Sequence, residues 1–308
     1  MTRVCVAGAG VIGSLFAGHL AQVVDVSVLV RREAHARALN EEGLRVSGRA
    51  DLQSQVTAST DPALLPEPDL VLVCSKGTDL PDLAARMAGH FAGATMMTVQ
   101  NGLGADEIVG EHGDWPILTS VTFMSGTRHA DTHVEYILDT ATWIGPSRAT
   151  THADAEQVAE LIRSSGLKAE SFADLRPALW SKLIFNATVN TVAALTGLPH
   201  QYQFAELDQP GDLGHLVLAL IDEGKAVAAA AGVELGEDPW EMNVHATRRG
   251  FRHYPSMLED VEARRPTEIE LITGSLIREG HRLGVPVELH ETMYRLIKAK
   301  EASWQESV

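Results

Sequence analysis

Short apolar runs alternate with stretches of helical spacing through the first hundred residues. Runs of strand length lie at Val4–Ala7, Val26–Val30, Leu70–Ser75 and Thr95–Val99, and Val11–Val23 has the spacing of a helix. The runs show little alternation of apolar and polar positions, which is typical of parallel strands covered on both faces. The pattern therefore predicts an α/β domain with a doubly wound parallel sheet.

Three further strands follow without long helices between them. The sequence predicts them at Ile117–Phe123, His133–Leu138 and Ala141–Ile144, with Asp139 and Thr140 in a turn. Strands joined by such short connections pair antiparallel. We therefore expect them to form an antiparallel extension that closes the sheet.

Helical spacing dominates the rest of the chain. A helix is predicted at Asp154–Ser165, with Gly166 as the residue that ends it. Beyond Leu175 no convincing strand appears, and Thr196–Asp212 has the composition of a long connection. The main helices are predicted at Leu179–Leu195, Leu213–Ala231 and Thr267–Leu283. We predict two domains, an α/β domain at residues 1–170 and an all-helical domain at 171–308.

Composition narrows the class of protein. The chain has 308 residues, of which 45% are hydrophobic and 21% charged, as in globular proteins. The formal net charge of -16 disfavours binding to nucleic acid or to an anionic membrane surface. Cys5 and Cys74 both lie in apolar runs, which favours free thiols in a reducing compartment. No leader and no membrane-spanning run is evident, so a cytoplasmic location is expected.

A glycine motif lies between the first strand and the first helix. Gly8-Ala9-Gly10-Val11-Ile12-Gly13 matches G-x-G-x-x-G in the context that dinucleotide binding requires. Gly8 permits the tight turn, Gly10 lets the backbone approach a pyrophosphate, and Gly13 allows close packing of helix and strand. The helix N-terminus at Val11 and Ile12 faces the phosphate charge. These features predict a Rossmann domain that binds a nicotinamide dinucleotide; a glycine-rich turn without a ligand is the alternative.

Polar residues follow several of the predicted strands. Arg31 and Arg32 come after the second strand, where NAD-specific sites usually carry an acid, so a 2′-phosphate and hence NADPH (NADP+) is favoured. A solvated basic turn is the alternative, and Glu33 is close by. Lys76 and Asn101 follow two later strands, at the carboxyl edge where ligands of such sheets bind. A loop cation and an ordinary Asn-Gly turn are the alternatives there.

A polar stripe crosses an otherwise apolar helix in the second half. Lys182, Asn186 and Asn190 recur at every fourth residue and therefore share one helix face. A lysine in apolar surroundings is costly without partners, and desolvation lowers its pKa toward an acid/base range. A snorkelling lysine with asparagines that bond to backbone is the alternative. The stripe favours a functional site.

Ser256 and Glu268 form a weaker pair of candidates. Pro266 has the character of a first-turn residue, so Glu268 is expected near a helix N-terminus, where a carboxylate is often only a complement to the helix dipole. Ser256 in turn suits the start of a helix. No zinc-ligand spacing, hydrolase nucleophile motif, P-loop or nucleic-acid module is evident, and no metal is expected.

Together these motifs resemble the ketopantoate reductase family (2-dehydropantoate 2-reductases), almost from end to end. The resemblance rests on GAGVIG, VLVRR, VLVCSK, VQNGLG, LWSKLIFNATVNTVAAL, YPSMLEDVEARRPTEIELITG and LGVPV. It implies a Rossmann domain with an all-helical C-terminal domain. Two positions depart from the pattern: Gln100 stands where histidine is frequent, and Thr191 where proline is frequent.

The resemblance also implies roles for individual residues. Lys182 is expected to be the general acid that protonates the new alkoxide, and Glu268 to bind substrate or orient the lysine. Substrate contacts are expected from Asn186, Asn190 and Ser256, the last to the carboxylate. Lys76 and Asn101 are expected beside the nicotinamide and the carbonyl, and Arg31 at the adenosine 2′-phosphate.

The expected reaction is the NADPH-dependent reduction of ketopantoate, a 2-oxo acid, to D-pantoate on the route to pantothenate. One alternative is another branched or aromatic 2-oxo acid as substrate. Another is a non-catalytic NADP-binding protein, against which the intact lysine–asparagine stripe argues. A homodimer is retained as one candidate assembly.

Overall fold

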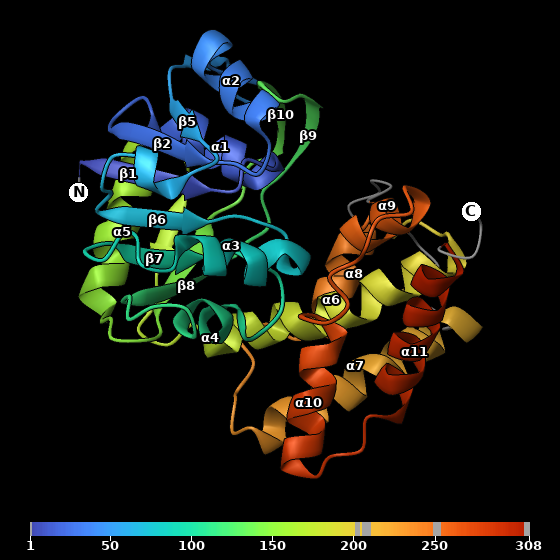
Figure 1. Ribbon diagram of the computed structural model, residues 1–308. Helices are drawn as coiled ribbons and strands as arrows, with labels where there is room; N and C mark the ends of the chain where they lie inside the picture. Colours follow the sequence, from blue (N-terminus) through green and yellow to red (C-terminus); the bar gives the residue numbers. More distant parts are fainter. Residues whose placement is uncertain (1, 201–203, 205–210, 249–253, 305–308) are drawn as a thin grey trace. The chain divides into compact units, whose positions relative to one another are not determined.

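The predicted apolar runs form the centre of an eight-stranded sheet (Figure 1). The strand order is β12-β11-β8-β7-β6-β1-β2-β5, and neighbouring strands are parallel except β8 and β11, which are antiparallel. The strands are β1 (Arg3–Ala7), β2 (Asp25–Leu29), β5 (Thr57–Ser59), β6 (Leu70–Val73), β7 (Thr95–Thr98), β8 (Ile117–Thr122), β11 (Thr142–Pro146) and β12 (Ala169–Ser171).

The computed structural model describes residues 2–200, 204, 211–248 and 254–304. Contacts divide the chain into two compact units. The first comprises Met1–Gln100 and Ala105–Leu175, and the second comprises Asn101–Gly104 and Arg176–Val308. The first is a Rossmann-type α/β unit and the second is helical where described, so the predicted fold class is confirmed.

Helices cover both faces of the main sheet. On one face, α1 (Val11–Leu20) and α5 (His152–Ser164) share an apolar core with alternate residues of the strands, among them Val4 and Val6. On the other face lie α3 (Leu80–Met87) and α4 (Ala105–Gly110) (Figure 1). The central strands are therefore buried on both sides, which explains their continuous apolar runs.

A second sheet packs against the opposite side of α1. Its strand order is β4-β3-β10-β9, with β3 (Leu44–Gly48), β4 (Leu52–Ser54), β9 (Ser125–Ala130) and β10 (His133–Leu138). Every residue from Gly13 to Leu20 is buried, and a Cβ on Gly18 would lie 2.5 Å from the Val46 side chain. Helix α1 is thus enclosed between two sheets, as expected for a helix that is apolar all round.

The predicted antiparallel extension is correct only in part. β8 and β11 form it, but the strand at His133–Leu138 is β10 of the second sheet, and its placement in the main sheet was wrong. β10 pairs with β9 in a hairpin whose turn contains Asp131 and Thr132. The pairing of β10 with β3 depends on a strand that the apolar pattern did not reveal.

Several further helical segments belong to the first unit. Helix α2 (Glu33–Glu42) follows β2, and two 3-10 turns, η1 (Pro62–Leu64) and η2 (Gly77–Asp79), lie near β6. Helix α5 begins with a capping box between Thr151 and Asp154. It ends before Gly166, whose φ of +88° confirms the predicted helix end.

The second unit is built around α6 (Arg176–Thr196), which contacts each of the other helices of this unit. Those are α7 (Asp212–Ala230), α8 (Pro239–Arg248), α9 (Ser256–Glu262), α10 (Thr273–Leu283) and α11 (Glu288–Ser303). Buried residues of α6, including Leu183, Ile184 and Val192, form the centre of a separate apolar core. Most of the predicted connection at Thr196–Asp212 lies outside the described residues.

Helix α10 begins later than predicted. The expected start at Thr267 was wrong, because residues 268–272 form a bend and turns and the helix begins at Thr273. Glu268 therefore lies in a turn before the helix, where its carbonyl accepts a hydrogen bond from the N–H of Ile272 at 3.1 Å.

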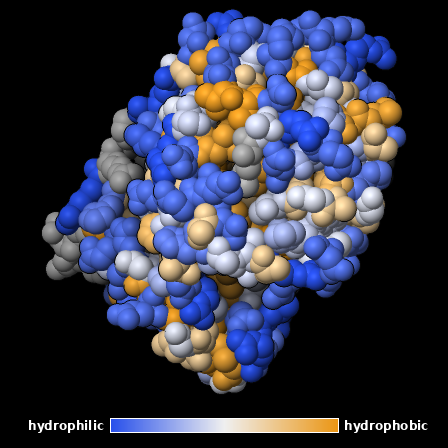
Figure 2. Space-filling model, turned by 90° about the vertical axis from the view of Figure 1, so that its left-hand side faces the viewer, coloured by the Kyte–Doolittle hydropathy of each residue, from blue (hydrophilic) through white to orange (hydrophobic). Residues whose placement is uncertain are grey.

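Both cysteines are free thiols, as the sequence predicted. Burial raises the pKa of Cys5 to about 12 and also raises the pKa of Cys74, so neither thiol has thiolate character. The face of the molecule in Figure 2 is largely hydrophilic, with hydrophobic side chains in separate patches. Within the described part of the chain, no helix combines the length and the apolar character needed to cross a bilayer.

Candidate functional site

The glycine loop of the first unit has the conformation that the motif requires. Gly8 has a φ of +103°, and a Cβ on it would lie 2.7 Å from the backbone N of Ser75. A Cβ on Gly13 would lie 1.9 Å from the carbonyl oxygen of Gly8. These two positions accept only glycine, because one requires a left-handed φ and the other a close approach of helix to loop.

Gly10, in contrast, faces open space. A Cβ there would meet no atom within 4 Å, so local packing gives no reason for a glycine. Gly10 is the N-cap of α1. The first turn of the helix carries no acidic side chain that could accept hydrogen bonds from its N–H groups. An open surface at a helix N-terminus with no carboxylate in the first turn fits a pyrophosphate.

Arg31 and Lys76 lie on the loops that follow β2 and β6. The Arg31 side chain is 75% exposed, and its Nη1 lies 3.2 Å from Oδ1 of Asp79. Lys76 is exposed and is the N-cap of η2, the turn that contains Asp79. The structure therefore brings these two predicted residues to neighbouring loops at the carboxyl edge of the sheet.

Gln100 joins the ends of two strands, a role that the sequence did not reveal. Its buried side-chain amide donates hydrogen bonds from Nε2 to the carbonyl oxygens of Val73 at 2.8 Å and Ser75 at 3.0 Å. The loop that leads to Lys76 is thereby tied to the end of β7. The sequence showed that a glutamine at this position is unusual, but it gave no indication of which groups its side chain would bind.

The predicted stripe lies on α6 of the second unit. Lys182 and Asn186 are partly buried, and Asn190 is buried. Among the described residues, the side-chain amides of Asn186 and Asn190 make no hydrogen bond within the protein. Their donors and acceptors are therefore available to a polar ligand.

The pKa of Lys182 lies well below that of an exposed lysine. Burial lowers the pKa of Lys182 from 10.5 to about 8, and the opposite charge of Glu268 limits the decrease. A pKa near the operating pH is the property that a general acid needs. Perturbation by desolvation together with one specific charge partner is typical of functional sites.

Glu268 also binds Asn101, which belongs to the second unit. Asn101 Nδ2 donates to Oε2 of Glu268 at 3.2 Å, and the N–H of Leu103 donates to the carbonyl oxygen of Leu271 at 3.1 Å. Gly102 has a φ of +96°, and a Cβ there would lie 1.8 Å from the Leu271 oxygen. The structure therefore brings three predicted residues together: Asn101, Lys182 and Glu268.

Ser256 is the exposed first residue of α9, the helix that packs against α6. Its helix-starting position matches one of the two interpretations of the sequence.

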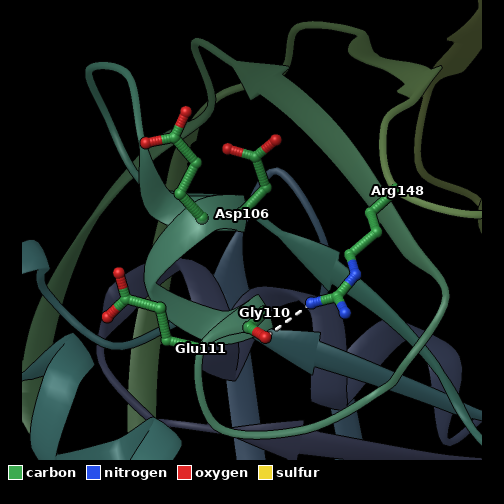
Figure 3. Close-up of a pocket in the computed structure, with 5 residues that line it drawn as sticks. Asp106, Gly110, Glu111 and Arg148 are labelled. Carbon is green, nitrogen blue, oxygen red and sulfur yellow. Dashed lines mark hydrogen bonds between the residues drawn. The ribbon is translucent and has the colours of Figure 1, made fainter.

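One hollow on the first unit is unrelated to these residues (Figure 3). It has a volume of about 430 Å³ and is lined by Asp106, Glu107, Gly110, Glu111 and Arg148. Arg148 bonds to the Gly110 carbonyl and pairs with Asp114 at 2.9 Å. No predicted site residue lines it, and its acidic lining is unsuited to a phosphate or a carboxylate.

The glycine loop of the first unit and the desolvated lysine of the second unit are typical of Rossmann-fold oxidoreductases. Residues 4–149 match the family described as ketopantoate reductase PanE/ApbA, and residues 174–301 match its C-terminal domain. The chain belongs to the ketopantoate reductase family and is a nicotinamide-dependent oxidoreductase.

Relatives and solved structures agree with this membership. The 2-dehydropantoate 2-reductase of Archaeoglobus fulgidus is 30% identical over 97% of this chain and 98% of its own, and that of Pyrococcus abyssi is 26% identical with the same coverage. A ketopantoate reductase structure from Ralstonia eutropha has a TM-score of 0.89 and 27% identity, covering 99% of this chain and 100% of its own. D-mandelate dehydrogenase with NADH and anilino(oxo)acetate has the same fold, with a TM-score of 0.86, 22% identity and coverage of 98% and 99%.

Proposed function

We propose that this enzyme uses NADPH to reduce ketopantoate to D-pantoate, a step toward pantothenate. The observation that carries the proposal is the lysine of α6, whose pKa is lowered to about 8 beside the carboxylate of Glu268. The relatives named 2-dehydropantoate 2-reductase, one of them 30% identical, support ketopantoate as the substrate. In this proposal residues 1–170 hold the cofactor and residues 171–308 hold the substrate.

The cofactor residues are those of the first unit, together with Asn101. Gly8, Gly10 and Gly13, with the N–H groups of Val11 and Ile12, would bind the pyrophosphate. Arg31 would bind the 2′-phosphate, and Lys76 and Asn101 would lie beside the nicotinamide. When bound, the reduced nicotinamide supplies a hydride to the carbonyl carbon of the substrate.

Lys182 supplies the proton. As the carbonyl oxygen gains negative charge, the Lys182 ammonium stabilises it and then transfers a proton from Nζ, which leaves a hydroxyl on the product and a neutral amine on the enzyme. Glu268 keeps the lysine protonated at neutral pH because its negative charge raises the lysine pKa against the effect of burial.

Uncharged hydrogen-bond donors would orient the substrate. Asn186 and Asn190 lie one and two turns along α6 from Lys182, so their amides can hold oxygen atoms of a substrate whose carbonyl meets the lysine. Ser256 would contact the carboxylate. A single carboxylate bound by amides and a hydroxyl suits a small 2-oxo acid.

The test is the initial rate of NADPH oxidation with ketopantoate, compared with NADH and with other branched or aromatic 2-oxo acids. Lys182→Ala should lower kcat by about 10²–10⁴-fold with little change in KM, the range typical of a lost general acid. Lys168→Ala is the matched control, because that lysine is 62% exposed and pairs with Asp139 of the first unit.

Near-normal kcat in Lys182→Ala would contradict the role of the lysine. Tight NADPH binding without turnover of any 2-oxo acid would favour a non-catalytic protein. Faster turnover of another acid than of ketopantoate would change the substrate and keep the mechanism.

A further inference from the structure

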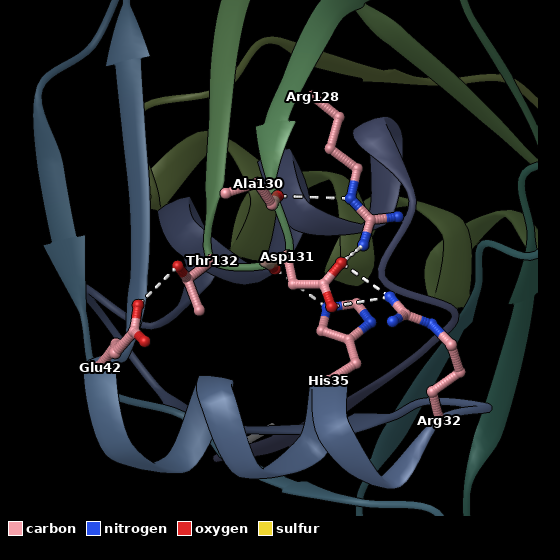
Figure 4. A network of polar contacts seen from close by, with 7 residues as sticks. All are labelled: Arg32, His35, Glu42, Arg128, Ala130, Asp131 and Thr132. Atoms are coloured by element: carbon pink, nitrogen blue, oxygen red, sulfur yellow. Dashed lines mark hydrogen bonds and ion pairs between the residues drawn. The ribbon is translucent and has the colours of Figure 1, made fainter.

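The two arginines after β2 bind different carboxylates. Arg31 pairs with Asp79, whereas Nη2 of Arg32 lies 2.7 Å from both carboxylate oxygens of Asp131. Figure 4 shows Asp131 in the turn between β9 and β10, pointing toward the start of α2. The hairpin therefore brings a negative charge to the end of β2, almost a hundred residues away in the sequence.

Asp131 is held firmly at this place. It also pairs with Arg128, and its backbone carbonyl accepts a hydrogen bond from Nε2 of the buried His35 at 2.9 Å. The hydrogen bond from Arg32 lowers the pKa of Asp131, so this carboxylate is ionised at neutral pH. A second link joins hairpin and helix, because Thr132 donates to Oε2 of Glu42 at 2.9 Å.

The end of β2 is the place where a Rossmann domain meets the 2′ substituent of the adenosine ribose. Three guanidinium groups gather there, from Arg31, Arg32 and Arg128, and two carboxylates, of Asp79 and Asp131, offset part of their charge. A 2′-phosphate at this place would interact with both the guanidinium groups and the carboxylates.

We infer that Asp131 is a specificity-determining residue, which holds Arg32 as its counter-ion and thereby weakens the preference of the site for a 2′-phosphate. This inference rests on the proposed binding of NADPH at Arg31. Asp131 acts through Arg32 and through its own charge, while Arg31 remains the direct contact.

The physical reason is competition between anions for one guanidinium. Arg32 is half-exposed, and its Nε and Nη1 make no hydrogen bond among the described residues, so a phosphate can reach it. With Asp131 in place, the phosphate meets a guanidinium that is already neutralised and a carboxylate that repels it. Replacement by asparagine removes the charge but keeps an oxygen that can accept a hydrogen bond from Arg32.

The experiment measures the affinities of adenosine 2′,5′-bisphosphate and 5′-AMP by calorimetry, since these probes differ only in the 2′-phosphate. Asp131→Asn should raise the ratio of the two affinities about tenfold, the gain expected from one charge-assisted contact, by tightening the bisphosphate alone. Thr132→Val is the matched control, because it breaks the other link between hairpin and α2 and leaves Asp131 intact. It should leave the ratio unchanged.

Two further variants test the same inference. Adding Arg32→Ala to Asp131→Asn should return the ratio to that of the unmodified protein. Arg32→Ala alone should change the ratio by less than about threefold, because Asp131 already holds this arginine. The second result does not depend on whether Asp131→Asn folds.

The inference is overturned if Asp131→Asn folds and leaves the ratio unchanged or lowers it. It is overturned as well if Thr132→Val raises the ratio equally, or if Arg32→Ala alone abolishes the preference. A different result separates it from the proposed function: if the unmodified protein shows no preference for the 2′-phosphate and Asp131→Asn acquires one, NADPH is wrong as the cofactor and the inference on Asp131 stands.

Discussion

Asn101 and Glu268 are 167 positions apart in the sequence, and the amide of one donates a hydrogen bond to the carboxylate of the other. The same carboxylate opposes the effect of burial on Lys182. Glu268 therefore connects a residue proposed for the cofactor and carbonyl with the proposed proton donor. The side-chain amide of Asn101 orients the Glu268 carboxylate, and the negative charge of that carboxylate raises the pKa of the Lys182 amine.

This arrangement predicts the effect of Glu268→Gln on the pH profile. In the proposed mechanism the acid form of Lys182 is the active form, so kcat/KM should fall as the pH rises through the lysine pKa of about 8. Glu268 raises that pKa, and loss of its charge should lower it further. The descending limb of the profile should therefore move to lower pH, by about one unit or more.

The matched control is Glu270→Gln. That carboxylate is exposed and contacts Tyr294 and Lys298, so its loss should leave the limb in place. A limb that stays fixed in Glu268→Gln would refute the electrostatic role of Glu268.

Two glycines of the loop should respond differently to alanine. At Gly10 the added methyl group meets open space, so Gly10→Ala should fold with a nearly unchanged Tm and bind the dinucleotide at least tenfold more weakly, because its Cβ occupies the approach to the backbone. Gly13→Ala should lower the Tm by several degrees, since its Cβ overlaps the Gly8 carbonyl. Thermal unfolding and calorimetry on both variants check the contrast, and normal dinucleotide affinity in Gly10→Ala would contradict it.

Loss of the Gln100 amide should weaken the cofactor site. Gln100→Leu leaves the carbonyl oxygens of Val73 and Ser75 without this donor, which frees the loop that carries Lys76. We expect NADPH to bind about three- to tenfold more weakly, the effect of one or two lost hydrogen bonds. Ser120→Ala, which removes another buried hydrogen bond of the same sheet, should lower stability without this loss of affinity.

A partly buried pair in the second unit predicts an acid-sensitive contribution to stability. Glu223 accepts hydrogen bonds from the side chain and N–H of the fully buried His290 and from the N–H of Leu289. Burial raises the pKa of Glu223, but these bonds outweigh it and leave the pKa below its ordinary value of 4.5. The stabilisation is therefore present above pH 4.5 and is lost as the pH falls through the pKa of the folded state.

Glu223→Gln should reduce the free energy of unfolding at pH 7 by about 1–3 kcal/mol, the cost of weakened bonds to buried donors. Urea unfolding should show this difference narrowing as the pH falls below 4.5. Glu156→Gln, at a surface carboxylate that pairs with Arg163, is the control and should change stability by less than about 0.5 kcal/mol. An equal loss of stability at pH 7 and pH 3.5 in Glu223→Gln would contradict the assignment.

Elements with a strong hydrophobic pattern were predictable from the sequence. The central strands are buried on both faces, and each left a continuous apolar run such as Leu70–Val73. The stripe from Lys182 to Asn190 was visible because helical geometry converts spacing into a shared face. The strands of the second sheet were harder to predict, since β9 is largely exposed and β4 has three residues.

Pairings between distant segments could not be predicted. The contacts of Asp131 with Arg32 and of Gln100 with Ser75 depend on tertiary structure, and their side chains are ordinary polar residues in loops. Helix α10 was extended too far toward Thr267 because Pro266 suits the first turn of a helix. In the structure residues 268–272 form a bend and turns, and the helix begins only at Thr273.

The helical unit is not one continuous stretch of the chain, because Asn101–Gly104 belong to it. Leu103 packs on its apolar core, and Asn101 supplies a donor to Glu268. Recombination of this enzyme with a relative would therefore fail to preserve the unit if the parental sequences were joined only at Leu175. A chimaera that also transfers the four residues after Gln100 keeps both contacts. The unit that can be exchanged between relatives is therefore a pair of separate segments and not the C-terminal half of the chain.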